Sequence, residues 1–503
     1  MTDKITIGVV GAGTMGRGIA QLYAQAGHPV RIYDAQPGAA GAAVAYVVGM
    51  LQRNVDKGRL AVDAFERIRA GISAAPDLGA LAGCAVVVEA IVEDLGVKRD
   101  LFRALEGILG EDAVLATNTS SLTVSEIAAG CARPERVAGL HFFNPVPLMK
   151  VAEVIAAVRT APATVQLLKD ITEGTGHRAV VTADQPGFLV NHAGRGLYTE
   201  GLRVVEEQVA TPADVDDVLR DAMGFRMGPF ELLDLTGLDV SSRVMASIYE
   251  QFHQEPRFRP SSLVPPRVAA GLFGRKSGEG WYRYVDSKPQ RPPARAVPAL
   301  AAGQSVWVDQ HAQQADVLKA LAVRAGLAVM NRGCDADLCI VQPWGMDATS
   351  TALSLGLDPA RTVAVDPVTP LELRRTLMLT TVTAPGARDL AHALLSSDGV
   401  AVTVINDSCG FIAQRVMATI VNIAANIVQR GIASVADLED SVKLGLGYPH
   451  GPLAWGDRIG PARILAILRA QQDATGDPRY RASPWLARRV ALGLPLLTPE
   501  AQR

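Results

Sequence analysis

The chain has 503 residues, of which 49 are Lys or Arg and 51 are Asp or Glu, so its formal net charge is only −2. This balance excludes a strongly basic nucleic-acid-binding protein, and no polybasic segment reverses that conclusion. No apolar run reaches the roughly 18–20 residues of a membrane span, and the longest, 85–92, contains Glu89. The five cysteines lack the neighbours of a zinc site, so we expect reduced thiols and no metal. Without a signal-peptide pattern at its start, the chain is expected to be a cytoplasmic protein of about three to four domains.

The first 34 residues predict a dinucleotide-binding unit. An apolar run over 5–10 leads into Gly11-Ala12-Gly13-Thr14-Met15-Gly16 and a helical pattern, and a second apolar run ends at Asp34. Gly11 permits a tight turn, Gly13 lets the backbone approach a pyrophosphate, and Gly16 lets the helix pack against the strand. Asp34 can accept hydrogen bonds from a ribose diol, and its charge would repel a 2′-phosphate. We therefore expect NAD as the cofactor in preference to NADP.

Two further strands carry polar residues to the same edge of this sheet. The buried run 84–92 ends at Glu93, with Lys98 one turn into the next helix, and the strand 113–116 opens into Asn118 and Ser120. Polar residues beyond the carboxyl ends of parallel strands face the cofactor crevice in doubly wound sheets. The segment Thr123-Val124-Ser125-Glu126 has the pattern of a capping box. That box accounts for its own residues and leaves Asn118 and Ser120 as functional candidates.

A histidine and a carboxylate are predicted to meet on neighbouring strands. Glu153 lies inside the apolar strand 150–156, where an unpaired carboxylate would cost several kcal/mol. His141, in the strand 137–143, precedes it across a proline turn that returns the chain to the same sheet. A carboxylate on one ring nitrogen fixes the tautomer and leaves the other nitrogen as a base. A strand histidine alone is more often a packing residue, but the neighbouring nucleotide crevice favours catalysis.

Four segments, 11–16, 89–93, 118–122 and 141–145, together resemble the 3-hydroxyacyl-CoA dehydrogenases, and the resemblance covers about residues 4–285. It implies that NAD takes a hydride from C3 of a 3-hydroxyacyl-CoA, giving the 3-oxoacyl-CoA. His141 would be the general base and Glu153 its orienting partner, while Ser120 would bond the reacting oxygen and Asn191 would hold substrate and histidine in register. The same resemblance implies NAD contacts at Gly11, Gly13, Thr14, Met15, Gly16, Asp34, Glu93, Lys98, Ser120, Asn144 and Lys276, and substrate contacts at Ser120, Asn191 and Lys57.

The acyl group stays open between a short chain, as in 3-hydroxybutyryl-CoA, and a dicarboxylic chain, as in 3-hydroxyadipyl-CoA. His192 stands where related sequences usually carry arginine, and we expect it to tune the pocket. His192, Arg195 and Arg203 could meet a distal carboxylate, or each could be a surface or core-edge residue.

The second half of the chain repeats the distal part of the first. An offset of 223 residues pairs Asp184 with Asp407 and Asp234 with Asp457, and it also pairs three glycines, Gly187, Gly224 and Gly237, with Gly410, Gly447 and Gly460. A constant offset indicates internal duplication. The second copy lacks the chemistry, because Gln414 replaces Asn191, Asp366 falls near the place of His141, and no acid matches Glu153. We interpret Gln414 as a structural relic.

These features predict four domains. An α/β Rossmann-type NAD-binding domain (1–185) precedes an all-α substrate and dimerisation domain (186–286), and a Pro-rich linker, 287–298, follows. A degenerate Rossmann-like α/β segment (299–405), with strand-like runs at 305–308 and 338–341, leads to a second all-α domain (406–503). This arrangement resembles the long bacterial 3-hydroxyacyl-CoA dehydrogenases of the phenylacetate-degradation type.

Two questions of function and assembly remain open. A homodimer and a pseudo-dimeric monomer both fit the duplication. The alternative functions are a β-hydroxyacid dehydrogenase acting on a free acid, which generally uses a lysine where this chain has Asn191, and a non-catalytic NAD-binding protein.

Overall fold

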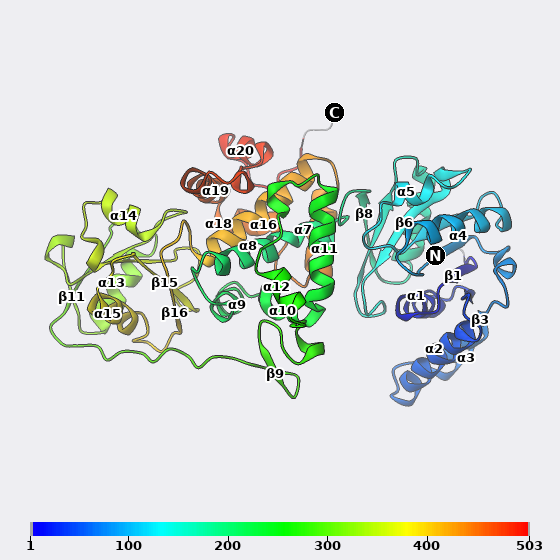
Figure 1. The fold of residues 1–503 in the computed structure, drawn as a ribbon, viewed down its shortest axis with the longest axis horizontal. Helices are drawn as coiled ribbons and strands as arrows, with labels where there is room; N and C mark the ends of the chain where they lie inside the picture. The colour runs from blue at the N-terminus through cyan, green and yellow to red at the C-terminus, as the bar shows by residue number, and fades with distance from the viewer. Residues whose placement is uncertain (1–3, 501–503) are drawn as a thin grey trace. The chain divides into compact units, whose positions relative to one another are not determined.

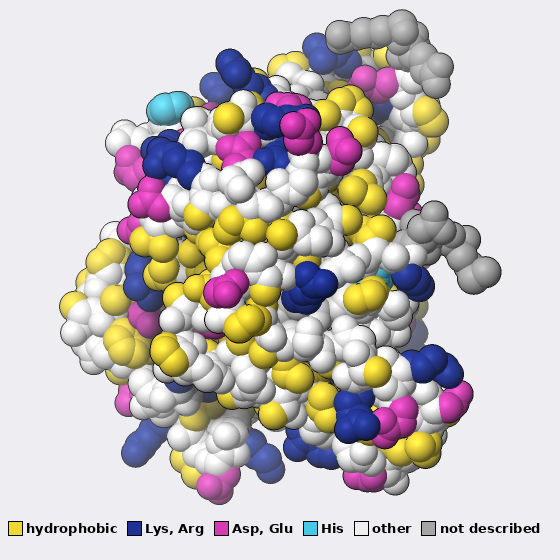
Figure 2. Space-filling view, turned by 90° about the vertical axis from the view of Figure 1, so that its right-hand side faces the viewer, with side chains coloured by type: hydrophobic (Ala, Val, Ile, Leu, Met, Phe, Trp, Pro, Cys, Tyr) yellow, Lys and Arg dark blue, Asp and Glu magenta, His cyan; other side chains and the backbone are white. Residues whose placement is uncertain are grey.

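The computed structural model describes residues 4–500, which form two compact units. The first unit runs to His192 and also contains Ile427–Leu446, and the second comprises Ala193–Asn426 with the chain from Gly447 onward. Among residues 4–500, no helix is both long and apolar enough to cross a membrane. Figure 2 shows basic and acidic side chains interleaved over one face, where the described residues form no extended area of a single sign.

The first unit is built on an eight-stranded sheet of order β3-β2-β1-β4-β5-β6-β7-β8 (Figure 1). All neighbouring strands are parallel except β6 and β7. β1, β4, β5 and β6 are buried along their whole lengths, as expected of parallel strands covered on both faces. The strands are β1 (Ile7–Val10), β2 (Val30–Tyr33), β3 (Ile72–Ala74), β4 (Val86–Glu89), β5 (Val114–Thr117), β6 (Val137–Phe142), β7 (Val151–Ala156) and β8 (Arg178–Ala183).

The strand order reverses between β1 and β4, which creates the crevice where doubly wound sheets bind ligands. Apolar side chains of the strands and helices form two cores, one on each face of this sheet. The helices that join these strands are α1 (Thr14–Gln25), α2 (Ala39–Asp56), α3 (Val62–Gly71), α4 (Leu95–Ile108), α5 (Val124–Ala128) and α6 (Pro162–Glu173).

One helix from the second copy completes the first unit. α17 (Val435–Gly445) packs against β7 and β8. Arg178 of β8 forms ion pairs with Asp437 (2.6 Å) and Asp440 (3.1 Å), and the Ala183 amide donates to the Ile432 carbonyl (2.8 Å). The edge strand β8 is therefore covered by chain that lies about 260 residues further along.

The second unit combines helices of both copies with a smaller sheet (Figure 1). This six-stranded sheet has the order β12-β11-β13-β14-β15-β16, and only β14 and β15 pair antiparallel. α13 and α15 pack on one face, and α14 contacts the strands as well. These elements are β11 (Ser305–Val308), α13 (Ala315–Arg324), β12 (Ala328–Val329), β13 (Leu338–Val341), α14 (Ala348–Ser354), β14 (Thr362–Val365), β15 (Arg375–Leu379), α15 (Pro385–Leu395) and β16 (Val402–Ile405). The predicted strands at 305–308 and 338–341 are confirmed.

The remaining helices belong to the two helical copies. The first copy contains α8 (Arg195–Glu206), α9 (Pro212–Asp221), α10 (Pro229–Thr236), α11 (Leu238–Gln251) and α12 (Val264–Ala269), and the second contains α18 (Pro452–Ile459), α19 (Pro461–Thr475) and α20 (Pro484–Ala491). α7 (Val190–Ala193) and α16 (Ile412–Gln429) each continue from one unit into the other. The predicted combination of a Rossmann-type domain, helical domains and a second α/β segment is thus confirmed.

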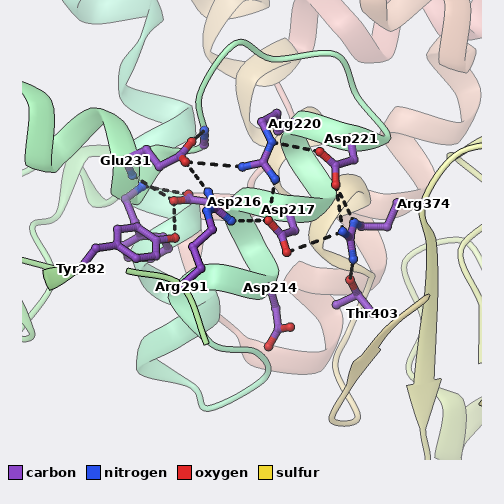
Figure 3. Close-up of polar contacts among 12 residues, drawn as sticks. Asp214, Asp216, Asp217, Arg220, Asp221, Glu231, Tyr282, Arg291, Arg374 and Thr403 are labelled. Carbon is purple, nitrogen blue, oxygen red and sulfur yellow. Dashed lines mark hydrogen bonds and ion pairs between the residues drawn. The ribbon is translucent and has the colours of Figure 1, made fainter. Parts of the chain in front are cut away.

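A polar network joins the second sheet to α9 within the second unit (Figure 3). Arg374, the residue before β15, forms ion pairs with Asp217 (3.6 Å) and Asp221 (2.9 Å) of α9. Arg220 bonds the same two aspartates at 2.7 and 2.9 Å, and Arg291 also contacts Asp217. Because several charges share these contacts, the network holds the sheet and the helix together more firmly than an isolated surface pair would.

Two local predictions are wrong. The capping box at Thr123 does not form, since the Thr123 hydroxyl bonds the Glu126 carboxylate and no backbone amide. Instead Asp184, which follows β8, accepts hydrogen bonds from the amides of Val124 (3.0 Å) and Ser125 (2.7 Å). A bidentate carboxylate at the end of β8, 60 residues from Val124 in the chain, satisfies the helix start that the local threonine was expected to satisfy.

The predicted linker over 287–298 is not entirely a linker. β10 (Lys288–Gln290) pairs antiparallel with β9 (Arg283–Val285). Asp286 and Ser287 both have positive φ, 49° and 62°, which is the backbone of a two-residue hairpin turn that matches the twist of its strands. The stretch without helix or strand therefore begins only at residue 291.

Candidate active site

The glycine turn after β1 has the shape that a dinucleotide phosphate needs. Gly11 has φ +103°, and a Cβ on it would lie 2.4 Å from the Ala90 carbonyl oxygen, so glycine is required there. A Cβ on Gly13 would meet no atom within 4 Å, which means that this side of the turn faces open space. The residues present therefore fit a pyrophosphate, because its close approach at Gly13 is unobstructed and the amides of the first turn of α1 have no partner within the helix.

Asp34 supports the glycine turn from the end of β2. Its Oδ2 accepts a hydrogen bond from the Ala12 amide (2.7 Å), and its Oδ1 accepts one from the Gln36 amide (2.8 Å). Each carboxylate oxygen can accept more than one hydrogen bond. Asp34 thus links the turn to β2 and keeps acceptor capacity for a ribose diol.

A buried charge network fills the sheet edge between β4 and β5. Lys98 of α4 is 1% exposed, and its Nζ lies 2.5 Å from Glu89 Oε1 and 3.3 Å from Glu93 Oε2. Glu89 Oε2 accepts a hydrogen bond from the Thr117 hydroxyl (2.7 Å). Two carboxylates around one ammonium make the charges of the network partly cancel, which such burial requires.

Glu93 organises the loop that follows β5. Its Oε1 accepts hydrogen bonds from the Thr119 hydroxyl (2.6 Å), the Ser120 amide (3.1 Å), and the amide and hydroxyl of Ser121. Burial by itself would raise the pKa of Glu93, but these hydrogen bonds and the charge of Lys98 outweigh it and bring the pKa below its ordinary value. Glu93 is therefore an ionised carboxylate whose hydrogen bonds fix the loop after β5.

Ser120 and Asn118 belong to this loop, but only Asn118 has a side-chain contact with the neighbouring strand. Ser120 is exposed, and its hydroxyl has no partner among residues 4–500. Asn118 Oδ1 accepts a hydrogen bond from the Phe142 amide (2.8 Å), so it ties the loop to β6. Part of the pattern that suggested function for Asn118 is thus explained by this structural contact.

His141 and Glu153 face each other across the antiparallel pair β6–β7. His141 Nδ1 lies 2.6 Å from Glu153 Oε2, and the two side chains are 7% and 0% exposed. Glu153 Oε1 accepts hydrogen bonds from the amides of Leu189 (2.9 Å) and Val190 (2.8 Å). Since both carboxylate oxygens act as acceptors, the shared proton belongs on His141 Nδ1, which leaves Nε2 with its lone pair.

These groups surround one pocket of about 360 Å³ at the carboxyl ends of β1, β4, β5 and β6. The His141 ring packs against Phe143 and Phe188, with centroids 4.6 and 5.7 Å away, so one end of the pocket is polar and the histidine wall is apolar. The lining residues are Met15, Ala90, Ile91, Glu93, Lys98, Asn118, Ser120, His141, Phe142, Phe143, Asn144 and Asn191.

Several predicted site residues are not among those that line this pocket. Lys57 is exposed at the end of α2 and does not line the pocket. Lys276 belongs to the second unit, where its Nζ pairs with Asp239 Oδ1 at 2.5 Å. His192 is 1% exposed, and Arg195 is buried with its guanidinium 4.9 Å from the Tyr198 ring.

Arg203, the third candidate for a distal carboxylate, forms an ion pair with Glu207 at 2.6 Å and a longer one with Asp477 at 3.8 Å. Its charge is already balanced by acids of the second unit. This pairing favours the structural reading of Arg203 over a role in substrate recognition.

Sequence reasoning missed Glu89, Thr117 and Thr119 as parts of the site. The signal for Glu89 was present, because a carboxylate at the end of an apolar strand needs a partner as much as Glu153 does. No pattern marked the two threonines, whose hydroxyls contribute only through the carboxylates beside them.

The glycine turn, the acidic residue after β2 and the pocket at the switch point define a dinucleotide-dependent dehydrogenase of the Rossmann class. Residues 6–185 match the sequence model of the 3-hydroxyacyl-CoA dehydrogenase NAD binding domain, and residues 187–284 and 410–496 match that of the 3-hydroxyacyl-CoA dehydrogenase C-terminal domain. The chain belongs to the 3-hydroxyacyl-CoA dehydrogenase family and is an NAD-dependent oxidoreductase. The separate matches in both halves also support the internal duplication.

Individual relatives agree with this family over different lengths. A 3-hydroxyadipyl-CoA dehydrogenase of Escherichia coli K12 is 36% identical over 492 residues, which is 98% of each chain. A probable 3-hydroxybutyryl-CoA dehydrogenase of Deinococcus radiodurans is 38% identical over 277 residues, 55% of this chain and 99% of its own. The crystal structure of a 3-hydroxybutyryl-CoA dehydrogenase from Escherichia coli K12 aligns with a TM-score of 0.86 at 36% identity, covering 97% of this chain and 99% of its own.

Proposed function

We propose that this chain oxidises the 3-hydroxyl group of a 3-hydroxyacyl-CoA to the 3-oxo group, with His141 as the general base. The observation that carries the proposal is the His141–Glu153 contact of 2.6 Å at the wall of the pocket. A base must lie at the reacting proton with its lone pair free, and this geometry supplies that nitrogen at Nε2.

Four side chains of the pocket region have separate roles in this oxidation. His141 Nε2 takes the proton of the 3-hydroxyl, and Glu153 keeps the ring in the required tautomer and stabilises the imidazolium that forms. The Ser120 hydroxyl donates to the reacting oxygen, and Asn191 positions the substrate beside His141. NAD, when bound, accepts the hydride released from C3.

The cofactor would be held mainly by groups that follow four strands, β1, β2, β4 and β6. The glycine turn and the first turn of α1 would receive the pyrophosphate, and Asp34 the ribose diol. Glu93, Lys98 and Asn144 line the pocket and would also contact the dinucleotide. The predicted roles of Lys276 and of Lys57, the latter toward CoA, stay predictions.

The acyl group is proposed only as a class. The Escherichia coli relative that matches over the full length carries the name of a dicarboxylic substrate, while shorter relatives carry the name of 3-hydroxybutyryl-CoA. We propose that both kinds of acyl group are candidates, and a kinetic panel of the two CoA thioesters decides between them. Turnover of the free 3-hydroxy acids without CoA would instead favour a β-hydroxyacid dehydrogenase.

The direct test is His141→Gln, assayed by the oxidation of NADH with acetoacetyl-CoA. We expect turnover to fall by about 10²–10⁴-fold because the base is lost, while the affinity for NADH, measured by fluorescence titration, stays nearly unchanged. His311→Gln alters an exposed histidine of the second unit and serves as the matched control. Near-normal turnover in His141→Gln would refute the proposed role.

A further inference from the structure

The second sheet also ends at a pocket. A cavity of about 350 Å³ lies in the second unit beyond the carboxyl ends of three of its strands. Gln313 follows β11, Trp344 follows β13, and Val368 follows β14. Arg458 of α18 and Arg463 of α19 line the helical side. This is the edge at which parallel α/β sheets bind ligands, and its size falls within the roughly 300–1,000 Å³ of small-molecule pockets.

The charges of this pocket have one sign. Arg458 and Arg463 are exposed, and neither forms an ion pair with a carboxylate among residues 4–500. No aspartate or glutamate lines the cavity. Arg374 and Arg415, in the same unit, are each paired with two carboxylates. Two uncompensated guanidinium groups facing one cavity favour an anionic ligand.

Flat aromatic surface accompanies the charges. The Arg463 guanidinium lies 4.7 Å from the centre of the Trp344 ring, which holds the charged group at the pocket wall. Trp455 also lines the cavity and is only 4% exposed, and His450 packs against it with centroids 5.6 Å apart. Guanidinium planes and indole rings are surfaces on which planar bases stack, while the guanidinium N–H groups bind phosphate oxygens.

We propose that this pocket binds an adenosine phosphate, with Arg458 and Arg463 on the phosphate and the base against the tryptophan and guanidinium planes. The degenerate sheet then keeps a nucleotide site although it lacks the glycine turn of the first sheet. The proposal does not depend on the function proposed above, because none of its residues lines the first pocket.

The test is equilibrium binding of ADP to the full chain, measured by calorimetry. In Arg458→Ala/Arg463→Ala we expect one class of ADP sites to weaken by at least about tenfold. Arg469→Ala removes the same charge from an exposed position of α19 and should bind ADP like the unaltered chain. Trp344→Leu, which keeps both charges, should weaken the same class of sites. All three should retain normal NADH-dependent turnover, which reports that the first site is intact.

Competition then identifies the source of the ligand. Displacement of ADP from this class of sites by CoA or by NAD assigns the adenosine phosphate to that molecule, and resistance to both assigns a free nucleotide. Inorganic phosphate that competes as well as ADP would overturn the role of the base. Equal ADP binding by Arg458→Ala/Arg463→Ala and the unaltered chain would overturn the proposal as a whole.

Discussion

The two sheets place different chemistry at corresponding strands. β6 of the first sheet carries His141 opposite Glu153, whereas β14 of the second ends at Asp366, whose Oδ1 accepts a hydrogen bond from Gln414 Nε2 (3.2 Å). Burial raises the pKa of Asp366 to about 7, and its Oδ2 has no hydrogen-bond partner among the described residues. Gln414 is fully buried and also bonds the Gly345 amide (2.7 Å) and the Pro343 carbonyl (3.0 Å). His141 has a ring nitrogen that could exchange a proton with a ligand. Gln414, the partner of Asp366, instead hydrogen-bonds backbone groups.

The residues that both copies share stabilise the backbone. Asp184 caps α5, and Asp407 caps α14 in the same way through the amides of Ala348 (2.7 Å) and Thr349 (3.2 Å). Asp234 and Asp457 each accept two consecutive amides from chain that lies about 40–50 residues further on. The three paired glycines all have positive φ: Gly187 and Gly410, Gly224 and Gly447, and Gly237 and Gly460. The two copies therefore share the residues that hold the backbone, and they differ at the positions of His141, Glu153 and Asn191.

One buried ion pair joins the two copies, and the positions that match its residues do not form a second such pair. Arg415 pairs with Glu200 at 2.7 Å, with both side chains at most 3% exposed. The residues that match them at the offset of 223 are His192 and Ile423. The second copy thus carries the arginine that the first has replaced by histidine, and its carboxylate partner comes from the first copy.

Among the variants that compare the two copies, the largest effect is expected from Glu153→Gln. The amide oxygen can still accept from Leu189 and Val190, but the charge that stabilises the His141 imidazolium is lost, so kcat should fall by about 10²-fold or more. Asp366→Asn, its matched control in the second sheet, should leave kcat unchanged. Steady-state kinetics with acetoacetyl-CoA measure both, and comparable losses in the two variants would abolish the distinction between the sheets.

The second prediction concerns the pH dependence of stability. Asp366 has a pKa of about 7 in the folded chain against an ordinary 3.8, so from about pH 4 to 7 the folded state keeps a proton that the unfolded state loses. The free energy of unfolding should then fall with rising pH, by about 1.4 kcal/mol per unit from this group. Asp216, whose pKa burial also raises to about 7, adds a similar slope.

Asp366→Asn removes only the contribution of Asp366. Thermal unfolding at about pH 8 should show the variant more stable than the unaltered chain, by up to about 4 kcal/mol, and the difference should nearly vanish at about pH 4. A gap that is independent of pH would mean that the aspartate titrates normally in the folded chain.

A smaller effect tests the shared helix caps. Asp184→Ala and Asp407→Ala each leave two helix amides without their acceptor, and each should lower the free energy of unfolding by about 1–2 kcal/mol. Asp112→Ala, at an exposed position outside the helices and strands, provides the reference in the same denaturation assay. Unequal losses at the two caps would show that the copies no longer use this residue alike.

The smallest effect is expected at Thr123. Its hydroxyl bonds no backbone amide, so Thr123→Ala should change the free energy of unfolding by less than about 0.5 kcal/mol. Thr211→Ala should cost about 1 kcal/mol, because Thr211 accepts the Asp214 amide in a complete capping box at the start of α9. A larger loss at Thr123 than at Thr211 would contradict the assignment of the α5 cap to Asp184.

Much of the fold follows from local pattern. The glycine turn between two apolar runs, the buried strands and the proline turn before β7 are encoded within short segments, and the family matches confirm the fold class. The contact of His141 with Glu153 could be anticipated because a buried carboxylate needs a partner and the chain returns within 12 residues. The catalytic roles of these residues stay predictions, and so do the bounds of the four domains.

The sequence by itself determined the elements whose partners lie nearby in the chain: the nucleotide-binding turn, the paired strands of His141 and Glu153, and the offset of the duplication. Only the tertiary structure decided which residues cap α5, that Glu89 and Lys98 form a buried pair, and that α17 covers the edge strand β8. It also brought Arg458 and Arg463 to the same pocket as Val368, which precedes them by 90 and 95 residues in the chain. The physical reason is that hydrophobic periodicity reports which face of an element is buried, whereas the partner of a polar group depends on which distant segment packs against that face.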